Sequence, residues 1–335
     1  MPSKIAPLEL VKRVRRGDHA AASRALTVVV NDAPGSEALA KEFFKASGSA
    51  QKVGVSGPPG AGKSSLTGRL ISFYRAKKLK VGVLMVDPSS SISGGAFLGD
   101  RLRVMEHAVD PGVFIRSLAS RGMIGGLTYA IFGAIHVLET LGCDKILVET
   151  VGTGQDEVEI ASVADTILYV TTPAMGDEIQ AMKAGAMEIG DIFVVNKADL
   201  AGKDKAVADL KAALGLGHSA GQAQKPWEPP VLATSAKTGE GIPELASALD
   251  AHWAHLEKSG EGRARLKGQH ATELQFWIQR RVIKSALDRV TDKILEDMVS
   301  RKTDPASVGR RLPDAFVEVR DRDADVMKLH RASRR

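Results

Sequence analysis

The stretch that decides the fold is Gly57 to Leu66, which reads GPPGAGKSSL and follows the short apolar run Val53 to Val55. It matches the pattern G-x-x-x-x-G-K-[ST] and leads into a helix-compatible run, SSLTGRLISFYRAK. Backbone N–H groups of such a turn face phosphate oxygens at the start of a helix. We expect Lys63 to reach the β- and γ-phosphates and the Ser64 hydroxyl to bind Mg²⁺. The predicted phosphate-binding loop consists of Gly57, Pro58, Pro59, Gly60, Ala61, Gly62, Lys63, Ser64 and Ser65.

Short runs rich in β-branched residues recur along the chain and alternate with helix-like stretches. These runs are KVGVSG, KVGVLMVD, VFIRSL, KILVET, TILYVT, IFVVNK and VLATSA. Strands that are apolar throughout are buried on both faces, which is typical of a mostly parallel sheet flanked by helices. The sequence therefore predicts an α/β domain over residues 51–256. We expect an N-terminal helical extension over 1–50 and a C-terminal helical region over 257–335.

The C-terminal region carries an apolar stripe at helical spacing that includes Leu274, Trp277, Ile278 and Val282. A stripe outside the main core has to be covered. It could fold back on the α/β domain or pair with a second copy of the chain. We favour the second, a homodimer joined through the C-terminal helices.

Composition limits the location and the partners. No segment approaches the ~20 consecutive apolar residues of a membrane span, so no membrane association is expected. The single cysteine, Cys143, allows no internal disulfide, which is typical of a reducing compartment and predicts a cytoplasmic protein. The formal charge of +6 is spread along the chain, so nucleic acid is not an expected partner.

The base is predicted from VVNKADL, residues 194–200, at the end of an apolar run. In the pattern N-K-x-D, the Asp199 carboxylate can accept hydrogen bonds from guanine N1 and the exocyclic amine. Asn196 can meet the other edge of the base, and the stem of Lys197 can lie over the ring. Adenine presents the opposite donor pattern, so GTP is favoured over ATP. The later stretch ATSAKTG predicts backbone contacts to the guanine oxygen from Ser235, Ala236 and Lys237.

Carboxylates after apolar runs predict a metal site. ILVETVGTG carries Glu149 and, three residues later, Gly152, whose N–H could sense the γ-phosphate. Asp87 ends another run and Asp100 follows in a glycine-rich stretch, although a helix cap and a solvated loop charge are the alternatives. The predicted Mg²⁺ ligands are Ser64, Asp87, Asp100 and Glu149. No residue is singled out as the activator of the attacking water, so we expect slow hydrolysis without a partner.

These segments together, with ETVGTGQDEVEI, AMGDEIQAMKAGAMEIGDIFVVNKAD and TSAKTGEGI, closely resemble the MeaB family. The resemblance implies a P-loop NTPase fold and a homodimeric GTPase chaperone. This chaperone would gate adenosylcobalamin loading into methylmalonyl-CoA mutase and protect or reactivate that enzyme. The resemblance also implies an additional switch in PAMGDEIQAMKAG, where Asp177 and Lys183 would couple the partner to the nucleotide. The residues then expected to act in hydrolysis and its control are Lys63, Glu149, Asp177 and Lys183.

Other functions stay open from the residues alone. A metallochaperone-type GTPase usually carries a clustered Cys/His segment, whereas the eight histidines here are scattered. A chaperone of a different cobalamin-dependent acyl-CoA mutase is also compatible, because partner choice lies in surface residues without a readable motif. A transport-linked kinase would favour ATP, and NKAD argues against it. We expect no cobalamin site in this chain, since it has no Asp-x-His-x-x-Gly stretch.

Overall fold

The computed structural model describes residues 6–87, 104, 106–119, 130–150, 160–175, 184–219 and 226–314, apart from a few side chains at the ends of these ranges. The chain divides into two compact units, Met1–Thr272 and Glu273–Arg335. The first unit holds the sheet and the helices around it, and the second is helical where it is described.

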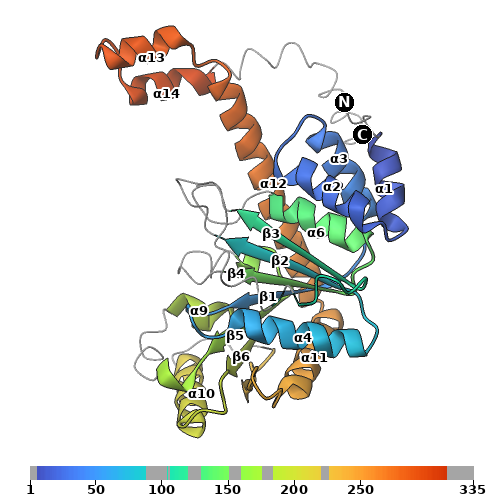
Figure 1. Cartoon of the computed structure of the whole chain (residues 1–335). Helices are drawn as coiled ribbons and strands as arrows, with labels where there is room; N and C mark the ends of the chain where they lie inside the picture. The colour runs from blue at the N-terminus through green and yellow to red at the C-terminus, as the bar shows by residue number, and fades with distance from the viewer. Residues whose placement is uncertain are drawn as a thin grey trace, which may run out of the picture. The chain divides into compact units, whose positions relative to one another are not determined.

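A seven-stranded sheet forms the centre of the first unit (Figure 1), and every described strand pair in it is parallel. The strand order is β3-β2-β4-β1-β5-β6-β7. The strands are β1 (Gln51–Ser56), β2 (Val81–Asp87), β3 (Val113–Ala119), β4 (Lys145–Thr150), β5 (Thr166–Thr171), β6 (Ile192–Val195) and β7 (Val231–Ala233). Each strand arises from one of the seven apolar runs, and β1, β4, β5 and β6 are buried along their whole length. The predicted parallel α/β fold is confirmed.

Helices cover both faces of this sheet. On one face, α4 (Lys63–Ala76) and α11 (Ile242–Ser259) share an apolar core with alternate residues of the strands, such as Val53 and Val55. On the other face, Gly82 leaves room for Leu138 of α6 (Ala130–Thr140), because a Cβ at Gly82 would lie 2.8 Å from Leu138 Cδ1. Successive side chains along each strand point to opposite faces of the sheet, so they pack against two separate helix layers.

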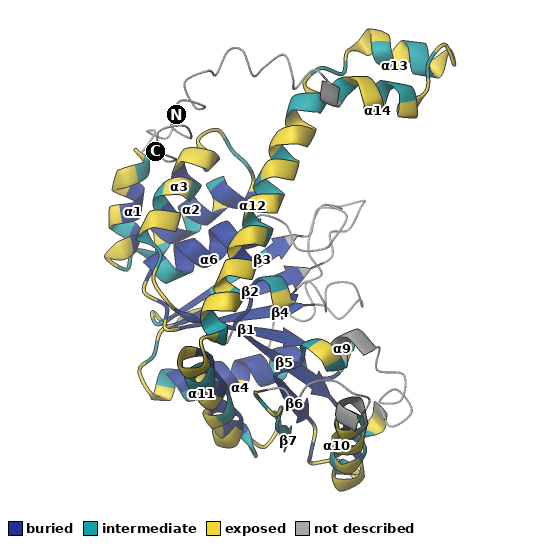
Figure 2. Ribbon diagram, turned by 180° about the vertical axis from the view of Figure 1, so that it is seen from behind, coloured by how far each residue is buried: buried dark blue, intermediate teal, exposed yellow. Residues whose placement is uncertain are grey.

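Three N-terminal helices cover α6 from outside, namely α1 (Pro7–Arg15), α2 (His19–Val30) and α3 (Ser36–Ala46). Every residue of α6 except Glu139 is buried, as Figure 2 shows for the helix as a whole. A Cβ on Gly133 would overlap Cγ1 of Val29, so the glycine allows α2 to approach α6 closely. An apolar helix such as AIFGAIHVLET needs this cover on its outer side. The predicted N-terminal extension is thus an integral layer of the first unit.

The remaining elements complete the two units. They are the short 3₁₀ turns η1 (Ile160–Ser162) and η2 (Pro173–Met175) and the helices α9 (Ala184–Ile189), α10 (Lys203–Ser219), α12 (Glu261–Leu287), α13 (Asp292–Val299) and α14 (Pro305–Asp314).

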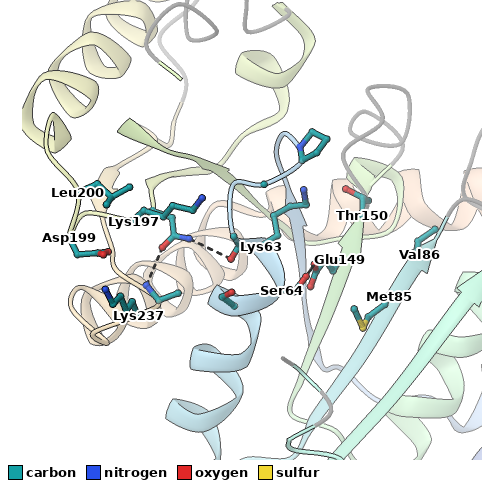
Figure 3. Close-up of a pocket in the computed structure, with 16 residues that line it drawn as sticks. Lys63, Ser64, Met85, Val86, Glu149, Thr150, Lys197, Asp199, Leu200 and Lys237 are labelled. Atoms are coloured by element: carbon teal, nitrogen blue, oxygen red, sulfur yellow. Dashed lines mark hydrogen bonds between the residues drawn. The ribbon is translucent and has the colours of Figure 1, made fainter. Parts of the chain in front are cut away.

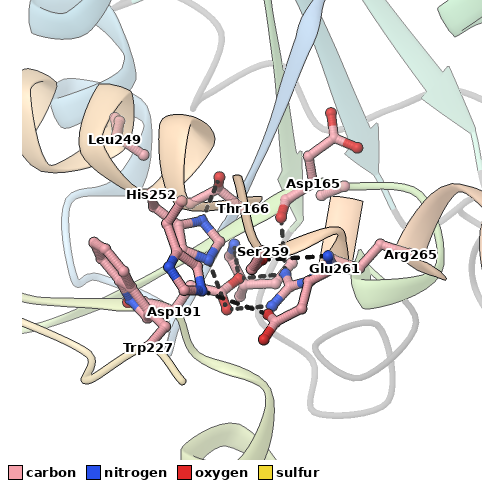
Figure 4. Close-up of polar contacts among 12 residues, drawn as sticks. Asp165, Thr166, Asp191, Trp227, Leu249, His252, Ser259, Glu261 and Arg265 are labelled. Atoms are coloured by element: carbon pink, nitrogen blue, oxygen red, sulfur yellow. Dashed lines mark hydrogen bonds and ion pairs between the residues drawn. The ribbon is translucent and has the colours of Figure 1, made fainter. Parts of the chain in front are cut away.

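A buried polar cluster fastens the start of α12 to the amino-terminal edge of the sheet (Figure 4). The Arg265 guanidinium donates to both carboxylate oxygens of Asp191 at 2.8 and 2.7 Å, and it also donates to the Asp165 carbonyl oxygen at 2.8 Å. Gln269 donates to Asp165 Oδ1 and to the Ala164 carbonyl oxygen, each at 3.1 Å. Asp165 and Asp191 directly precede β5 and β6. The first unit therefore extends to Thr272, whereas the sequence placed the domain boundary between residues 256 and 257.

The second unit, where it is described, consists of the later part of α12 with α13 and α14. The Thr291 side chain accepts a hydrogen bond from Ile294 N–H and caps α13. Large apolar side chains in this unit are exposed, namely Leu274, Ile278, Val282, Ile283, Leu287, Leu295 and Val299. Across the described residues, none of the helices has the length and apolar character that crossing a bilayer requires.

His252 of α11 makes the stability of the first unit depend on pH. Its side chain is fully buried, with Nδ1 2.9 Å from Thr166 Oγ1 and Nε2 3.4 Å from Asp191 Oδ1. Burial lowers the pKa of His252 to about 4, although the Asp191 charge opposes this shift. Because the unfolded chain takes up the proton first, stability is full above about pH 6.5 and falls as the pH approaches about 4.

We expect a pH-dependent loss of about 2–3 kcal/mol in the free energy of unfolding between about pH 7 and pH 4.5 from this group alone. Urea unfolding followed by circular dichroism measures it. The matched control is His252→Gln, which cannot titrate and should show a correspondingly flatter dependence on pH. Equal pH dependence in the two proteins would count against this assignment.

Candidate nucleotide-binding site

A cavity of about 690 Å³ opens at the carboxyl ends of the central strands (Figure 3). From β1 the chain crosses to β2 on one side of β1, whereas β5 lies on the other side of β1. The direction in which strands are added to the sheet therefore reverses at β1. Parallel sheets bind ligands at such switch points. The cavity is lined by Pro59, Gly60, Gly62, Lys63, Ser64, Ser65, Met85, Val86, Glu149, Thr150, Asn196, Lys197, Asp199, Leu200, Ala236 and Lys237.

The loop between β1 and α4 requires its glycines. Gly57 has φ +133°, and a Cβ there would overlap the Val170 carbonyl oxygen. Gly62 has φ +87°, and a Cβ there would lie 2.5 Å from Asn196 Nδ2. Both the left-handed backbone and the close neighbours exclude larger residues. Gly62 precedes the first residue of α4, so the loop ends where the helix N–H groups begin.

Lys63 and Ser64, the first two residues of α4, are buried at the base of the cavity. Lys63 Nζ donates to the carbonyl oxygens of Gly57 at 2.7 Å and Pro58 at 3.0 Å. Ser64 Oγ donates to Glu149 Oε1 of β4 at 2.5 Å. The structure thus brings together two of the predicted metal ligands, a hydroxyl and a carboxylate, beside the phosphate-binding loop. Oxygen donors of these types suit Mg²⁺.

Asn196 joins the phosphate loop to the loop that follows β7. Its Nδ2 donates to the carbonyl oxygens of Ala61 at 2.9 Å and Gly62 at 3.5 Å. Its Oδ1 accepts from Thr234 Oγ1 at 3.3 Å and from Ala236 N–H at 3.2 Å. An amide side chain has two donors and two acceptor positions, and protein atoms occupy all of them. In this structure the Asn196 side chain therefore holds two loops together, and its expected contact with the base edge stays a prediction.

Asp199 and Lys197 are exposed at the rim of the cavity. The Ser235 hydroxyl donates to Asp199 Oδ1 at 2.7 Å, and this hydrogen bond holds the pKa of Asp199 below its usual value. The carboxylate is therefore charged at neutral pH and fixed in orientation, as an acceptor for two base donors should be. Lys197 has the left-handed φ of +59°, a conformation that is uncommon for a lysine.

Arg69 is a contributor that the sequence analysis missed. It lies on α4, and its guanidinium donates to the carbonyl oxygens of Ala236 at 2.6 Å and Lys237 at 2.8 Å. No motif marks it, because the contact depends on how α4 lies beside the loop after β7. Met85 and Val86 at the end of β2 also line the cavity, and they were missed for the same reason.

A profile of the family described as "Methylmalonyl Co-A mutase-associated GTPase MeaB" matches residues 22–291. The chain belongs to the MeaB family. Membership of this family explains the parallel sheet and the phosphate-binding loop. This MeaB-family protein is a GTPase that binds guanine nucleotide.

Relatives of this MeaB protein carry related names. A GTPase of Pyrococcus horikoshii is 43% identical and spans 89% of this chain and 95% of its own. GTPase ArgK of Escherichia coli is 31% identical and spans 84% and 85%. The protein named "Methylmalonic aciduria type A homolog, mitochondrial" of Mus musculus is 36% identical and spans 70% of this chain and 56% of its own. A crystal structure titled LAO/AO transport system kinase covers 95% of this chain and 99% of its own with a TM-score of 0.65 and 25% identity.

Several predicted site residues of this MeaB protein lie outside the described residues and stay predictions. Asp87 is the last residue of β2, and its side chain is not among those described. The others are Asp100, Gly152, Asp177 and Lys183.

We expect Asp199→Asn to exchange the base preference of this MeaB protein from guanine to xanthine. The amide can donate to the 2-oxo group of xanthine but leaves a guanine donor unpaired, so GTP affinity should fall by about 100-fold or more. Competition binding with GTP and XTP measures the exchange. Asp204→Asn, an exposed change on α10, is the control. Unchanged GTP affinity in Asp199→Asn would show that this carboxylate does not read the base.

Proposed function

We propose that this GTPase is a chaperone of an adenosylcobalamin-dependent methylmalonyl-CoA mutase, which gates cofactor loading and protects or reactivates the mutase. The observation that carries the proposal is the match of residues 22–291 to a family described as associated with that mutase. The name of the Mus musculus relative refers to methylmalonic aciduria, which supports a link to an enzyme that acts on a methylmalonyl group. A cytoplasmic location remains a prediction.

The described residues support specific roles in binding and hydrolysis. Ser64 and Glu149 would hold Mg²⁺ together with Asp87 and Asp100, and the bound ion would neutralise charge on the β- and γ-phosphates. Lys63 now contacts two loop carbonyl oxygens, so its ammonium already lies inside the loop that would surround the phosphates. It would exchange these contacts for phosphate oxygens when GTP binds.

The switch proposed for Asp177 and Lys183 has a physical route to the rest of the unit. In the sequence these two residues lie between η2 and α9, and α9 ends two residues before Asp191. Asp191 carries the two hydrogen bonds from Arg265 of α12. A change at the switch that moves α9 would therefore reach the start of α12 through a charged contact. We propose that the Gly152 N–H and this switch report the γ-phosphate to the mutase.

We also propose that the chain forms a homodimer through its second unit. The later part of α12 exposes Leu274, Ile278, Val282 and Ile283 at helical spacing, with exposed fractions of 60%, 54%, 36% and 49%. Exposed apolar rows of this kind mark association surfaces.

Sedimentation equilibrium tests the dimer. The expected mass is twice 35.6 kDa, and Ile278→Glu should lower it to that of one chain because a charge would be buried in the interface. Lys284→Glu, a charge change on the same helix, is the control for altered net charge. A single-chain mass for the unmodified protein would contradict the proposal.

Affinity capture from the protein's own cells, read by mass spectrometry, tests the chaperone function. The chain is loaded with GDP or with a non-hydrolysable GTP analogue. We expect an adenosylcobalamin-dependent mutase in amounts that differ between the two nucleotide states, because a switch presents different surfaces in each state. Lys63→Ala, which should lose nucleotide binding while staying folded, should abolish the difference. Recovery of a metalloenzyme without cobalamin would contradict the proposal and favour metal delivery.

A further inference from the structure

We propose that Arg69 is a positioning residue that determines purine specificity at the 6-position of the base. The inference rests on guanine binding in the cavity described above, and it is independent of the mutase partner. It assigns Arg69 the task of holding one backbone N–H, that of Lys237, in place to donate to the 6-oxo group.

Arg69 is an exposed residue of α4, yet its Nε donates to the Ala236 carbonyl oxygen at 2.6 Å and its terminal nitrogen donates to the Lys237 carbonyl oxygen at 2.8 Å. Two charge-assisted hydrogen bonds from one planar group fix direction as well as distance. The same helix supplies Lys63 and Ser64, so the base loop is fastened to the element that begins at the phosphate loop.

The backbone N–H groups of the turn after β7 differ in their hydrogen-bond partners. Ala236 N–H donates to Asn196 Oδ1 at 3.2 Å, and Thr238 N–H donates to Ser235 Oγ at 3.2 Å. Within the described part of the chain, Lys237 N–H has no recorded acceptor. Lys237 N–H is therefore the donor of this turn that can bind a ligand. Both Ala236 and Lys237 line the cavity.

The Ala236 carbonyl and the Lys237 N–H belong to one planar trans peptide, so they point in opposite directions. Arg69 draws the oxygen toward α4 and thereby turns the N–H away from α4. The 6-oxo group of guanine accepts such a hydrogen bond, whereas the 6-amino group of adenine would oppose donor to donor. Arg69 makes the base loop rigid in the orientation that rejects adenine.

Two different groups would recognise two different positions of the base. Asp199, which is oriented by Ser235, would read N1 and the 2-amino group, and Arg69 does not touch it. A defect at Arg69 should therefore be visible at the 6-position and absent at the 2-position.

Three nucleotides test this separation. 6-Thio-GTP differs from GTP only at the 6-position and offers a weaker acceptor, while ITP lacks only the 2-amino group. Equilibrium binding is measured for the unmodified protein, Arg69→Ala and Arg69→Lys. In both variants we expect the preference for GTP over 6-thio-GTP to fall about fivefold, as the loss of one oriented hydrogen bond implies. The preference for GTP over ITP should stay unchanged.

Two controls distinguish a specific effect of Arg69 from a general loss of charge or of folding. Lys77→Ala removes a positive charge at the end of the same helix without touching the base loop and should leave both preferences intact. The thermal unfolding of each variant shows whether it is folded. An equal loss of affinity for all three nucleotides, or a changed preference for GTP over ITP, would overturn the role of Arg69. GTP binding that survives Lys63→Ala would instead overturn the site itself.

Discussion

The amide of Asn196 is the contact on which the site depends. Asn196 directly follows the buried strand β6, and its side chain is almost fully buried. With its two donors it holds carbonyl oxygens of the phosphate loop, and with its acceptor it holds the loop after β7. Buried amides that use every hydrogen-bonding position are costly to disturb, because any change leaves a polar group unpaired. The phosphate and base ends of the cavity are thereby one rigid assembly, with Arg69 as a second link on the helix side.

A second polar assembly lies at the opposite edge of the sheet. Asp165 and Asp191 directly precede β5 and β6. Asp165 accepts a hydrogen bond from Lys52 N–H of β1, Asp191 accepts one from Ile167 N–H of β5, and both accept hydrogen bonds from α12. Removal of one member would leave an uncompensated charge, which is why such clusters fix a single arrangement. The sheet thus carries nucleotide chemistry at its carboxyl edge and the attachment of α12 at its amino edge. The strands β1, β4, β5 and β6 that lie between these two edges are buried along their whole length.

The predictable features are those that local sequence determines. Seven apolar runs predicted seven strands because burial on both faces demands continuous β-branched residues. The phosphate loop was predictable because Gly57 and Gly62 meet steric limits that only glycine satisfies. The contacts of Arg69 and the contacts by which Asn196 joins two loops were not predictable, since each links segments more than a hundred residues apart. No sequence motif marks Arg265 or Gln269, whose contacts with residues before β5 and β6 attach the start of α12 to the first unit.

From the contacts of its side chain we expect Asn196 to couple recognition of the base to recognition of the phosphates. The affinities for GDP, GMP and IDP, measured by calorimetry in the unmodified protein and in Asn196→Ala, report phosphate recognition and base recognition separately. We expect the variant to lose part of the affinity gained from the β-phosphate, measured as the ratio of GDP affinity to GMP affinity. The variant should also lose part of its preference for guanine, measured as the ratio of GDP affinity to IDP affinity. A folded variant in which only one of the two ratios falls would contradict the coupling.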